Sequence, residues 1–201
     1  VLQPLLARAV DRSFHCITGD ADTSTSDTVL LLASRRASHA AIGSADDPGL
    51  AAFAHALEAV CRTLAELVVR DGEGARKLVE IHVRGAADEA SARRAGLAVA
   101  NSPLVKTAIA GADANWGRVV MALGKSGEPL DPDRLAIRFG DVLISAGGGA
   151  VDGYDEALVA SHLAGREVRI EADLGVGDGR ARVWTCDLTH GYIDINADYR
   201  S

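Results

Sequence analysis

The sequence predicts a mixed α/β or α+β sandwich. Segments with helical spacing alternate with short strand-like segments along the 201 residues, which is typical of layered α/β folds. Two strand-like segments near the C-terminal end are joined by a glycine-rich turn, so the sheet is not expected to be entirely parallel. Aromatic residues make up only 4% of the chain, so Ala, Val, Leu and Ile must fill the core.

Helices and strands are expected to alternate from the N-terminal end onward. Apolar residues from Leu2 to Phe14 have helical spacing, and Asp46-Asp47-Pro48 is a typical start for a second helix, which ends at Gly72. The apolar stripe of this second helix consists of Leu50, Phe53, Leu57, Val60, Leu64 and Leu67. The continuous apolar run Val29 to Ala33 is typical of a buried strand, whereas Lys77 to Val83 alternates in polarity as a half-buried strand does.

The remainder of the chain is expected to contain more strands. The expected helices run from Asp88 to just before Pro103, over 115–123 and over 154–163. Strand-like segments lie at 137–144 (with a turn at Gly140-Asp141), 168–174, 182–185 and 192–195. Because the turn between 168–174 and 182–185 has the sequence GVGDG, these two segments are expected to form a hairpin.

Composition and charge exclude several classes of protein. The formal net charge is −7, which argues against a nucleic-acid-binding surface, since that requires clustered Lys and Arg. No apolar run approaches the roughly 20 residues that a membrane-spanning helix needs. Cys16, Cys61 and Cys186 are odd in number and far apart, which does not indicate a disulfide framework. We therefore expect a cytoplasmic protein that binds neither nucleic acid nor membrane.

Three motifs suggest a metal or phosphate site but depart from the known patterns. The run from Asp20 to Ser24 begins like a calcium loop, yet Thr25 stands where that loop needs Gly. The glycines at 175–179 precede a strand, not the helix that a phosphate-binding loop opens. Cys186 and His190 are four residues apart but do not lie on an expected helix. We therefore expect no metal site.

Three polar segments allow two interpretations each. The run 20–28 suits a hydrogen-bonded turn or the polar wall of an active site. Glu73, between Gly72 and Gly74, either lies in a solvated loop after a helix or approaches a ligand closely and pairs with an ammonium group. The C-terminal segment 196–201 is either frayed or docked into a pocket. The residues alone favour the turn and the solvated loop, and they leave the tail open.

Several stretches resemble the ornithine acetyltransferases, a family also called arginine-biosynthesis bifunctional proteins. The longest are NSPLVKTAIAGADANWGR at 101–118 and WTCDLTHGYIDINADYRS at 184–201. Shorter ones are DRSF, DTSTSDTVLLLA, GEGARK, LDPDRLAIRFGD and YDEA. The similarity runs in order from Val1 to Ser201.

The resemblance implies a self-processing acetyltransferase with the N-terminal-nucleophile fold. In this family the precursor cuts itself at an Ala–Thr bond, and the new N-terminal Thr of the β chain takes acetyl from N-acetylornithine and passes it to glutamate. The present chain resembles a β chain without its first residues, so the nucleophilic Thr is expected upstream of Val1 and no catalytic residue within the chain. The α chain is expected to supply the oxyanion donors and to complete an α2β2 heterotetramer.

The resemblance also assigns residues to the binding of substrate. Glu73 corresponds to a substrate-binding Glu that faces a substrate amine. Asn196 and Ser201 correspond to a substrate-binding Asn and to a terminal hydroxyl residue, which is commonly Thr. With the resemblance, the functional interpretation of Glu73 and of the tail is favoured over the solvated loop and the frayed end.

Two larger segments and the active-site wall follow from the same resemblance. A weak boundary near Gly124 to Gly127 separates residues 1–126, expected to share the catalytic core with the α chain, from 127–201, expected to form a smaller α/β subdomain. The tail 196–201 is expected to return to the active site. Thr25, Ser26 and Asp27 are expected at its wall, although the family often has Asn in place of Ser26.

Two other functions stay open at this point. One is a related N-terminal-nucleophile aminopeptidase or amidase, which would release its product to water. The other is a non-catalytic paralogue chain, which a residue other than Thr at the cleavage point would support. No cofactor is expected. The resemblance does not decide whether acetyl-CoA is a co-substrate, or whether the pathway is arginine biosynthesis or a secondary-metabolite branch.

Overall fold

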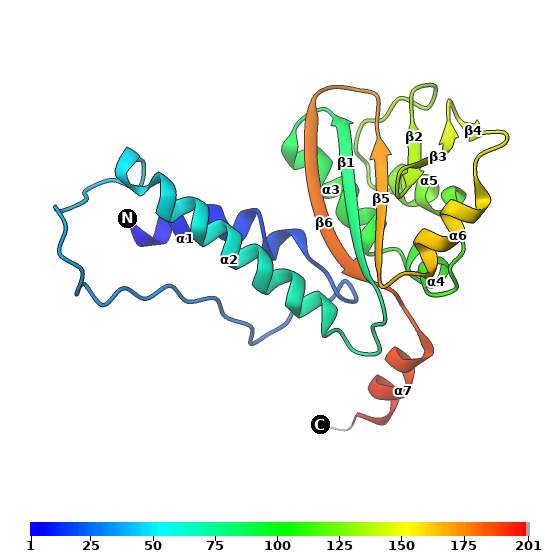
Figure 1. Ribbon diagram of the computed structural model, residues 1–201. Coiled ribbons are helices and arrows are strands. Elements are labelled where there is room, and N and C mark those ends of the chain that lie inside the picture. Colours follow the sequence, from blue (N-terminus) through cyan, green and yellow to red (C-terminus); the bar gives the residue numbers. More distant parts are fainter. Residues whose placement is uncertain (200–201) are drawn as a thin grey trace.

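A six-stranded mixed sheet forms the centre of the structure, a computed structural model that describes residues 1–199 (Figure 1). The strands are β1 (Leu78–Ala86), β2 (Ala136–Phe139), β3 (Val142–Ala146), β4 (Gly149–Ala150), β5 (Glu167–Asp173) and β6 (Gly179–Cys186). Their order in the sheet is β4-β3-β2-β5-β1-β6. β1 and β5 are parallel, and the other neighbouring strands are antiparallel. The expected mixed α/β class is therefore confirmed.

The expected hairpin between β5 and β6 is wrong, although the two strands are consecutive in the chain. β1 lies between them and pairs with both. The connection crosses the end of β1, where the N–H groups of Val176 and Gly177 donate to the carbonyl oxygen of Gly85 at 2.7 and 2.9 Å. Alternating polarity and a glycine turn identify two strands, but they do not reveal a third strand inserted between them.

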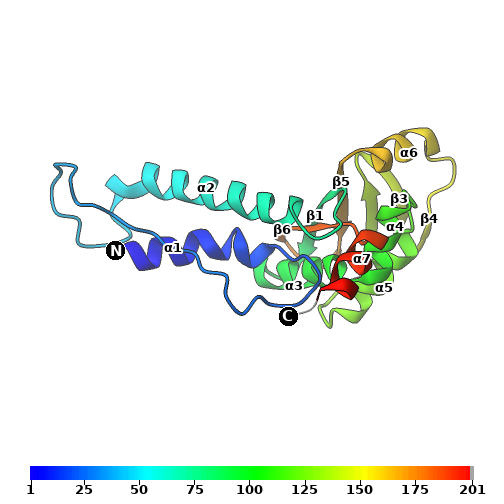
Figure 2. The ribbon, with the colours of Figure 1, turned by 90° about the horizontal axis from the view of Figure 1, so that it is seen from below.

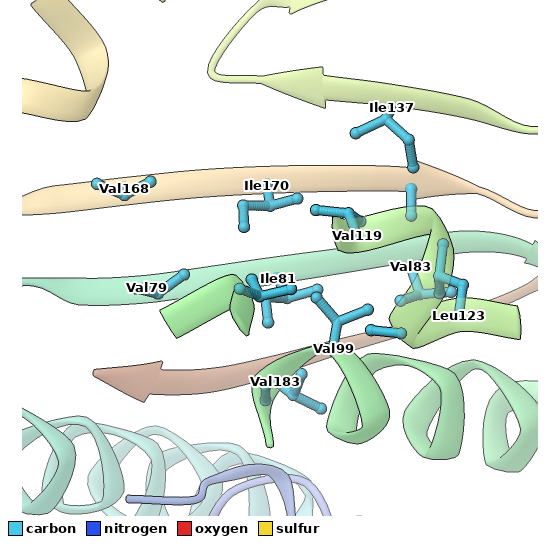
Figure 3. Packing of buried hydrophobic residues seen from close by; sticks show 14 of the residues in the cluster. Val79, Ile81, Val83, Val99, Val119, Leu123, Ile137, Val168, Ile170 and Val183 are labelled. Carbon is cyan, nitrogen blue, oxygen red and sulfur yellow. The ribbon is translucent and has the colours of Figure 1, made fainter. Parts of the chain in front are cut away.

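One face of the sheet packs against α3 (Glu89–Ala100) and α5 (Trp116–Lys125), as Figure 3 shows. The residues labelled there are at most 2% exposed: Val79, Ile81, Val83, Val99, Val119, Leu123, Ile137, Val168, Ile170 and Val183. Full burial of one such side chain stabilises a fold by about 1.5–3 kcal/mol. Alternate residues of β1 are partly or fully exposed, so the expected half-buried strand is confirmed.

The helices around the sheet begin at side-chain caps. Asp88 caps α3, Asn115 caps α5, and Asp155 caps α6 (Glu156–Ala164) by accepting hydrogen bonds from backbone N–H groups in the first turn. α4 (Pro103–Ala110) follows Ser102 directly and was not expected, because Pro103 marks the end of the preceding helix. Proline also suits the first turn of a new helix, so the same residue ends one helix and begins the next.

α1 (Leu2–Asp11) and α2 (Ala51–Arg70) form a helical pair that projects to one side of the sheet (Figures 1 and 2). Short 3-10 turns lie after α1 (Phe14–Cys16) and before α2 (Pro48–Leu50). The buried residues of α2 are Cys61, Ala65 and Val69. The bulkier members of the expected apolar stripe lie on other sides of α2, where Phe53, Val60, Leu64 and Leu67 are 44–55% exposed. Residues 1–199 thus leave much of this apolar stripe uncovered.

Two of the expected strands are wrong. Residues 29–33 form no strand, and Leu30 and Leu32 are 75% and 87% exposed, because no strand within residues 1–199 pairs with them. Residues 192–195 belong to the helix α7 (His190–Asp198). The hydroxyl of Thr189 caps this helix by accepting a hydrogen bond from the Gly191 N–H at 3.1 Å. Alternation over four residues is too short to distinguish a strand from a helix.

The boundary expected near residue 126 does not separate the strands. β1 precedes it, yet pairs with β5 and β6, which follow it. The division into 1–126 and 127–201 stays a prediction. Within residues 1–199, no helix combines the length and the apolar character that crossing a membrane requires.

Candidate functional site

The loop after α2 packs closely against the start of α7. Gly74 has a φ of +69°, and a Cβ atom there would lie 2.3 Å from the backbone nitrogen of Tyr192. The hydroxyl of Thr189 donates to the Gly74 carbonyl oxygen at 2.7 Å. Both the left-handed backbone and the close approach require a residue without a side chain. The result is a fixed contact between two segments that are 115 residues apart.

This contact brings Glu73 and Asn196 together. The Asn196 side-chain nitrogen donates to Glu73 Oε2 at 2.6 Å and to the Tyr192 carbonyl oxygen at 3.0 Å. Both protons of the amide group are therefore used. Glu73 Oε1 and Asn196 Oδ1 form no hydrogen bond to another residue in 1–199, and both side chains are exposed. The pair thus presents two acceptor oxygens, one of them on a carboxylate, which suits a cationic or neutral amine.

Two acidic residues, Asp187 and Asp20, form hydrogen bonds to the segments that carry Glu73 and Asn196. Asp187 is 2% exposed, and its Oδ1 accepts hydrogen bonds from the N–H groups of Arg76 and Lys77 at 2.8 and 2.9 Å, just after the Glu73 loop. Asp20 accepts a hydrogen bond from the Tyr192 hydroxyl at 2.9 Å, one turn before Asn196. One acid therefore fixes the Glu73 side and the other fixes the Asn196 side.

The hydrogen bonds at Asp20 also affect its acidity. The backbone N–H of Asp22 and, less strongly, the hydroxyl of Tyr192 hold the pKa of the Asp20 carboxyl below its ordinary value. The same contact raises the pKa of Tyr192. Asp20 is thus an anion near neutral pH and Tyr192 keeps its proton, which is the state that this hydrogen bond needs.

Thr25, Ser26 and Asp27 are exposed and form local turns. The Ser24 hydroxyl accepts from the N–H groups of Ser26 and Asp27, and the hydroxyls of Thr25 and Ser26 are 3.4 Å apart. None of their hydrogen bonds within residues 1–199 reaches Glu73 or Asn196. From the same polar run, Asp20 is the residue that the structure links to α7. The active-site wall at 25–27 stays a prediction.

The other expectations about sites concern Ser201 and metals. Ser201 lies outside the described residues. Among residues 1–199, no group of three or more His, Cys, Asp and Glu side chains is arranged to hold a metal ion. Cys186 is buried at the end of β6, whereas His190 begins α7.

A hollow of about 1160 Å³ lies elsewhere, between the α1–α2 pair and the polar side of β1 and β6. Neither Glu73 nor Asn196 lines it. Its lining contains seven arginines and four acids, and three of the arginines pair with an acid of the lining: Arg12 with Glu58, Arg84 with Glu171 and Arg93 with Asp11. The candidate site is therefore chosen for the convergence of Glu73 and Asn196, not for the size of a hollow.

Sequence reasoning missed several residues that build this site, notably Asp187, Thr189, Tyr192 and Lys106, whose Nζ donates to the Cys186 carbonyl oxygen beside Asp187 at 2.6 Å. All four lie in the two longest stretches that carry the family resemblance, but that resemblance assigned them no role. Lys106 had a visible signal, because it is a charged residue between Val105 and Ala108 on a helix whose neighbouring residues are mostly apolar. The others became apparent only through their contacts.

Comparisons with known proteins find relatives along the whole chain. The ArgJ family model matches residues 1–201. The arginine biosynthesis bifunctional protein ArgJ of Gluconobacter oxydans is 58% identical over 201 residues, covering 100% of this chain and 47% of that protein. The ArgJ protein of Zymomonas mobilis is 55% identical, with 100% and 49% covered.

A solved structure is also similar. The crystal structure of arginine biosynthesis bifunctional protein ArgJ from Bacillus halodurans matches with a TM-score of 0.93 and 39% identity, covering 98% of this chain and 92% of that one. The fold expected from the resemblance is thereby confirmed. The chain spans about half the length of the curated relatives it matches, 47% and 49% of the first two. On these matches, the chain belongs to the ArgJ family.

Proposed function

We propose that this chain is part of an acyltransferase of arginine biosynthesis that moves an acetyl group from N-acetylornithine to glutamate. The observation that carries the proposal is the 2.6 Å contact between Glu73 and Asn196, two residues 123 positions apart. Each of them has an acceptor oxygen that forms no hydrogen bond to another residue in 1–199. Membership of the ArgJ family supports it. We further propose that the protein acts in the cytoplasm.

The Glu73–Asn196 pair is the part of this reaction that the chain itself supplies. Glu73 Oε1 accepts a hydrogen bond from a substrate amine, and the carboxylate charge favours the ammonium form. Asn196 keeps Glu73 oriented through Nδ2 and offers Oδ1 as a second acceptor. Ser201 completes the binding of substrate. A small charged substrate is held by a few such polar groups placed together.

The proposed reaction has two steps, with a nucleophilic Thr that is not among the 201 residues. Its hydroxyl oxygen attacks the acetyl carbonyl carbon of N-acetylornithine, and its free α-amine takes the hydroxyl proton. The carbon–nitrogen bond breaks, the proton passes to the leaving nitrogen, and ornithine departs. The amine of glutamate then attacks the acetyl-Thr ester, which gives N-acetylglutamate and restores the Thr hydroxyl. No cofactor takes part.

The uncovered apolar surface supports a partner chain of the same precursor. Phe53, Val60, Leu64, Leu67 and Val68 on α2 are 44–55% exposed, and Leu30 and Leu32 in the loop before α2 are 75% and 87% exposed. A run of exposed apolar residues along one helix marks an interaction surface. The relatives are about twice as long as this chain, since it covers 47–49% of the first two. We propose that the other half, as an α chain, covers this surface within an α2β2 assembly.

Changing Leu64 and Leu67 to Asp is expected to weaken the association of the two chains about 100-fold or more, because each buried Leu contributes about 1.5–3 kcal/mol. The measurement is co-purification of both chains from a cell that makes the full-length precursor. Leu158→Asp is the matched control, since Leu158 is 58% exposed but lies on α6, away from this surface. A double variant whose chains co-purify as well as those of the wild type would remove this surface from the interface.

The activity is tested on the full-length precursor with N-acetylornithine and glutamate, following ornithine and N-acetylglutamate. We expect the two products in equal amounts without acetyl-CoA. A second arm replaces N-acetylornithine by acetyl-CoA and shows whether that molecule is also an acetyl donor. Ornithine without N-acetylglutamate would indicate an amidase instead, and the absence of turnover would contradict the proposed function.

A further inference from the structure

Lys106 is a buried cation that the proposed reaction does not use directly. It lies on α4 and is 3% exposed. Its Nζ donates to the carbonyl oxygen of Gly19 at 2.5 Å, to the hydroxyl of Thr185 at 2.8 Å and to the carbonyl oxygen of Cys186 at 2.6 Å. These three acceptors use all three protons of the ammonium group.

The burial of this group opposes its charged state. Desolvation lowers the pKa of Lys106, although the neighbouring Cys186, Asp187 and Asp20 act in the opposite direction. An apolar side chain would occupy the same place on α4 without that cost. The presence of an amine with three well-placed acceptors therefore indicates that its geometry matters. Lys106 also accepts a hydrogen bond from the Leu188 N–H through its carbonyl oxygen, at 3.2 Å.

Lys106 contacts two chain segments, and in each of them the next residue is one of the two acids beside the Glu73–Asn196 pair. Gly19 precedes Asp20, which accepts the hydrogen bond from Tyr192 on α7. Cys186 precedes Asp187, which accepts the N–H groups just after the Glu73 loop. One ammonium group thus fixes the distance between the acid that holds the Asn196 side and the acid that holds the Glu73 side.

We propose that Lys106 is a positioning residue that sets the separation of Glu73 and Asn196 by joining Gly19 to Cys186. The proposal rests on the proposed function, in which that pair binds the substrate amine. Lys106 does not touch the substrate. It acts through Asp20 and Asp187, and its loss is expected to loosen the attachment of α7 to the loop that carries Glu73.

Ser145 offers a control in another part of the sheet. It lies on β3 and is 2% exposed. Its hydroxyl donates to the carbonyl oxygen of Gly149 at 2.8 Å, so Ser145→Ala also removes a buried donor to a backbone carbonyl. Because β2 and β5 separate β3 from β1 and β6, the loss of this hydroxyl is not expected to release the Glu73–Asn196 pair.

The experiment compares Lys106→Met and Ser145→Ala in the full-length precursor, with KM and kcat for N-acetylornithine and hydrogen exchange over residues 189–199. Lys106→Met is expected to raise KM about tenfold or more, because small displacements of binding groups are costly, and to speed exchange in α7. Ser145→Ala is expected to lower the melting temperature but to leave KM within about twofold of the wild type.

Tyr192→Phe tests the same link if Lys106→Met does not fold. It removes the exposed contact to Asp20 and is expected to raise KM and speed exchange in α7. The proposal is overturned if Lys106→Met, or Tyr192→Phe in its place, keeps wild-type KM and exchange, or if Ser145→Ala changes both as strongly. Wild-type protein without acetyl transfer would refute the proposed function instead, and exchange in α7 would still decide whether Lys106 holds that helix.

Discussion

Glu73→Ala is expected to lower kcat/KM for acetyl transfer about 10- to 100-fold, because a hydrogen bond to a charged group contributes about 1.5–3 kcal/mol. The side chain is exposed, and its one hydrogen bond within residues 1–199 is to Asn196. The free energy of unfolding is therefore expected to change little, and the melting temperature by no more than about 2 °C. The measurement is steady-state kinetics with N-acetylornithine and glutamate on the full-length precursor.

Two control variants separate the charge of Glu73 from other effects. Glu73→Gln keeps the shape and one acceptor oxygen but loses the charge, so it is expected to recover only part of the activity. Asp71→Ala removes an exposed carboxylate two residues away at the end of α2 and is expected to leave the kinetics unchanged. Wild-type kcat/KM in Glu73→Ala, or an equal loss in Asp71→Ala, would exclude a specific contact between Glu73 and the substrate.

The sequence identified Glu73 as a candidate but not the geometry that surrounds it. A carboxylate between two glycines after a long helix is a local pattern, and the structure places it in such a loop. The approach of Asn196 depends on α7 being a helix and on Gly74 allowing its backbone to come close. Both are tertiary properties, and the four-residue alternation at 192–195 indicated a strand instead.

Two apolar segments that the sequence marks as buried are not covered by the rest of residues 1–199. The run Val29 to Ala33 and the stripe containing Leu64 have the composition of buried elements, yet both are exposed in this chain. Some capped helices, such as α3 after Asp88, were predicted correctly because a cap acts within one turn. The caps of α4 and α7, Ser102 and Thr189, did not reveal those helices from the sequence. The uncovered apolar residues of α2 fit the proposed partner chain.

Gly74→Ala is expected to reduce kcat/KM more than tenfold, because it disrupts the contact between the Glu73 loop and α7. A displacement of about 1 Å in a binding group can lower the rate about 100-fold. The new Cβ would lie 2.3 Å from the Tyr192 nitrogen and 2.5 Å from the Gly191 carbonyl carbon. Both are backbone atoms, so α7 must move away and take Asn196 with it. The positive φ adds a strain of about 1–2 kcal/mol.

Gly127→Ala separates the strain from the close approach. Gly127 has a φ of +76°, and a Cβ there would meet nothing within 4 Å. It is therefore expected to lower the stability by about 1–2 kcal/mol and to leave kcat/KM unchanged. If Gly74→Ala keeps wild-type kinetics, the contact between the Glu73 loop and α7 does not position Asn196. If Gly127→Ala loses activity to the same degree, backbone strain alone explains the effect. A loss confined to Gly74→Ala would show that the activity depends on how closely α7 approaches the Glu73 loop.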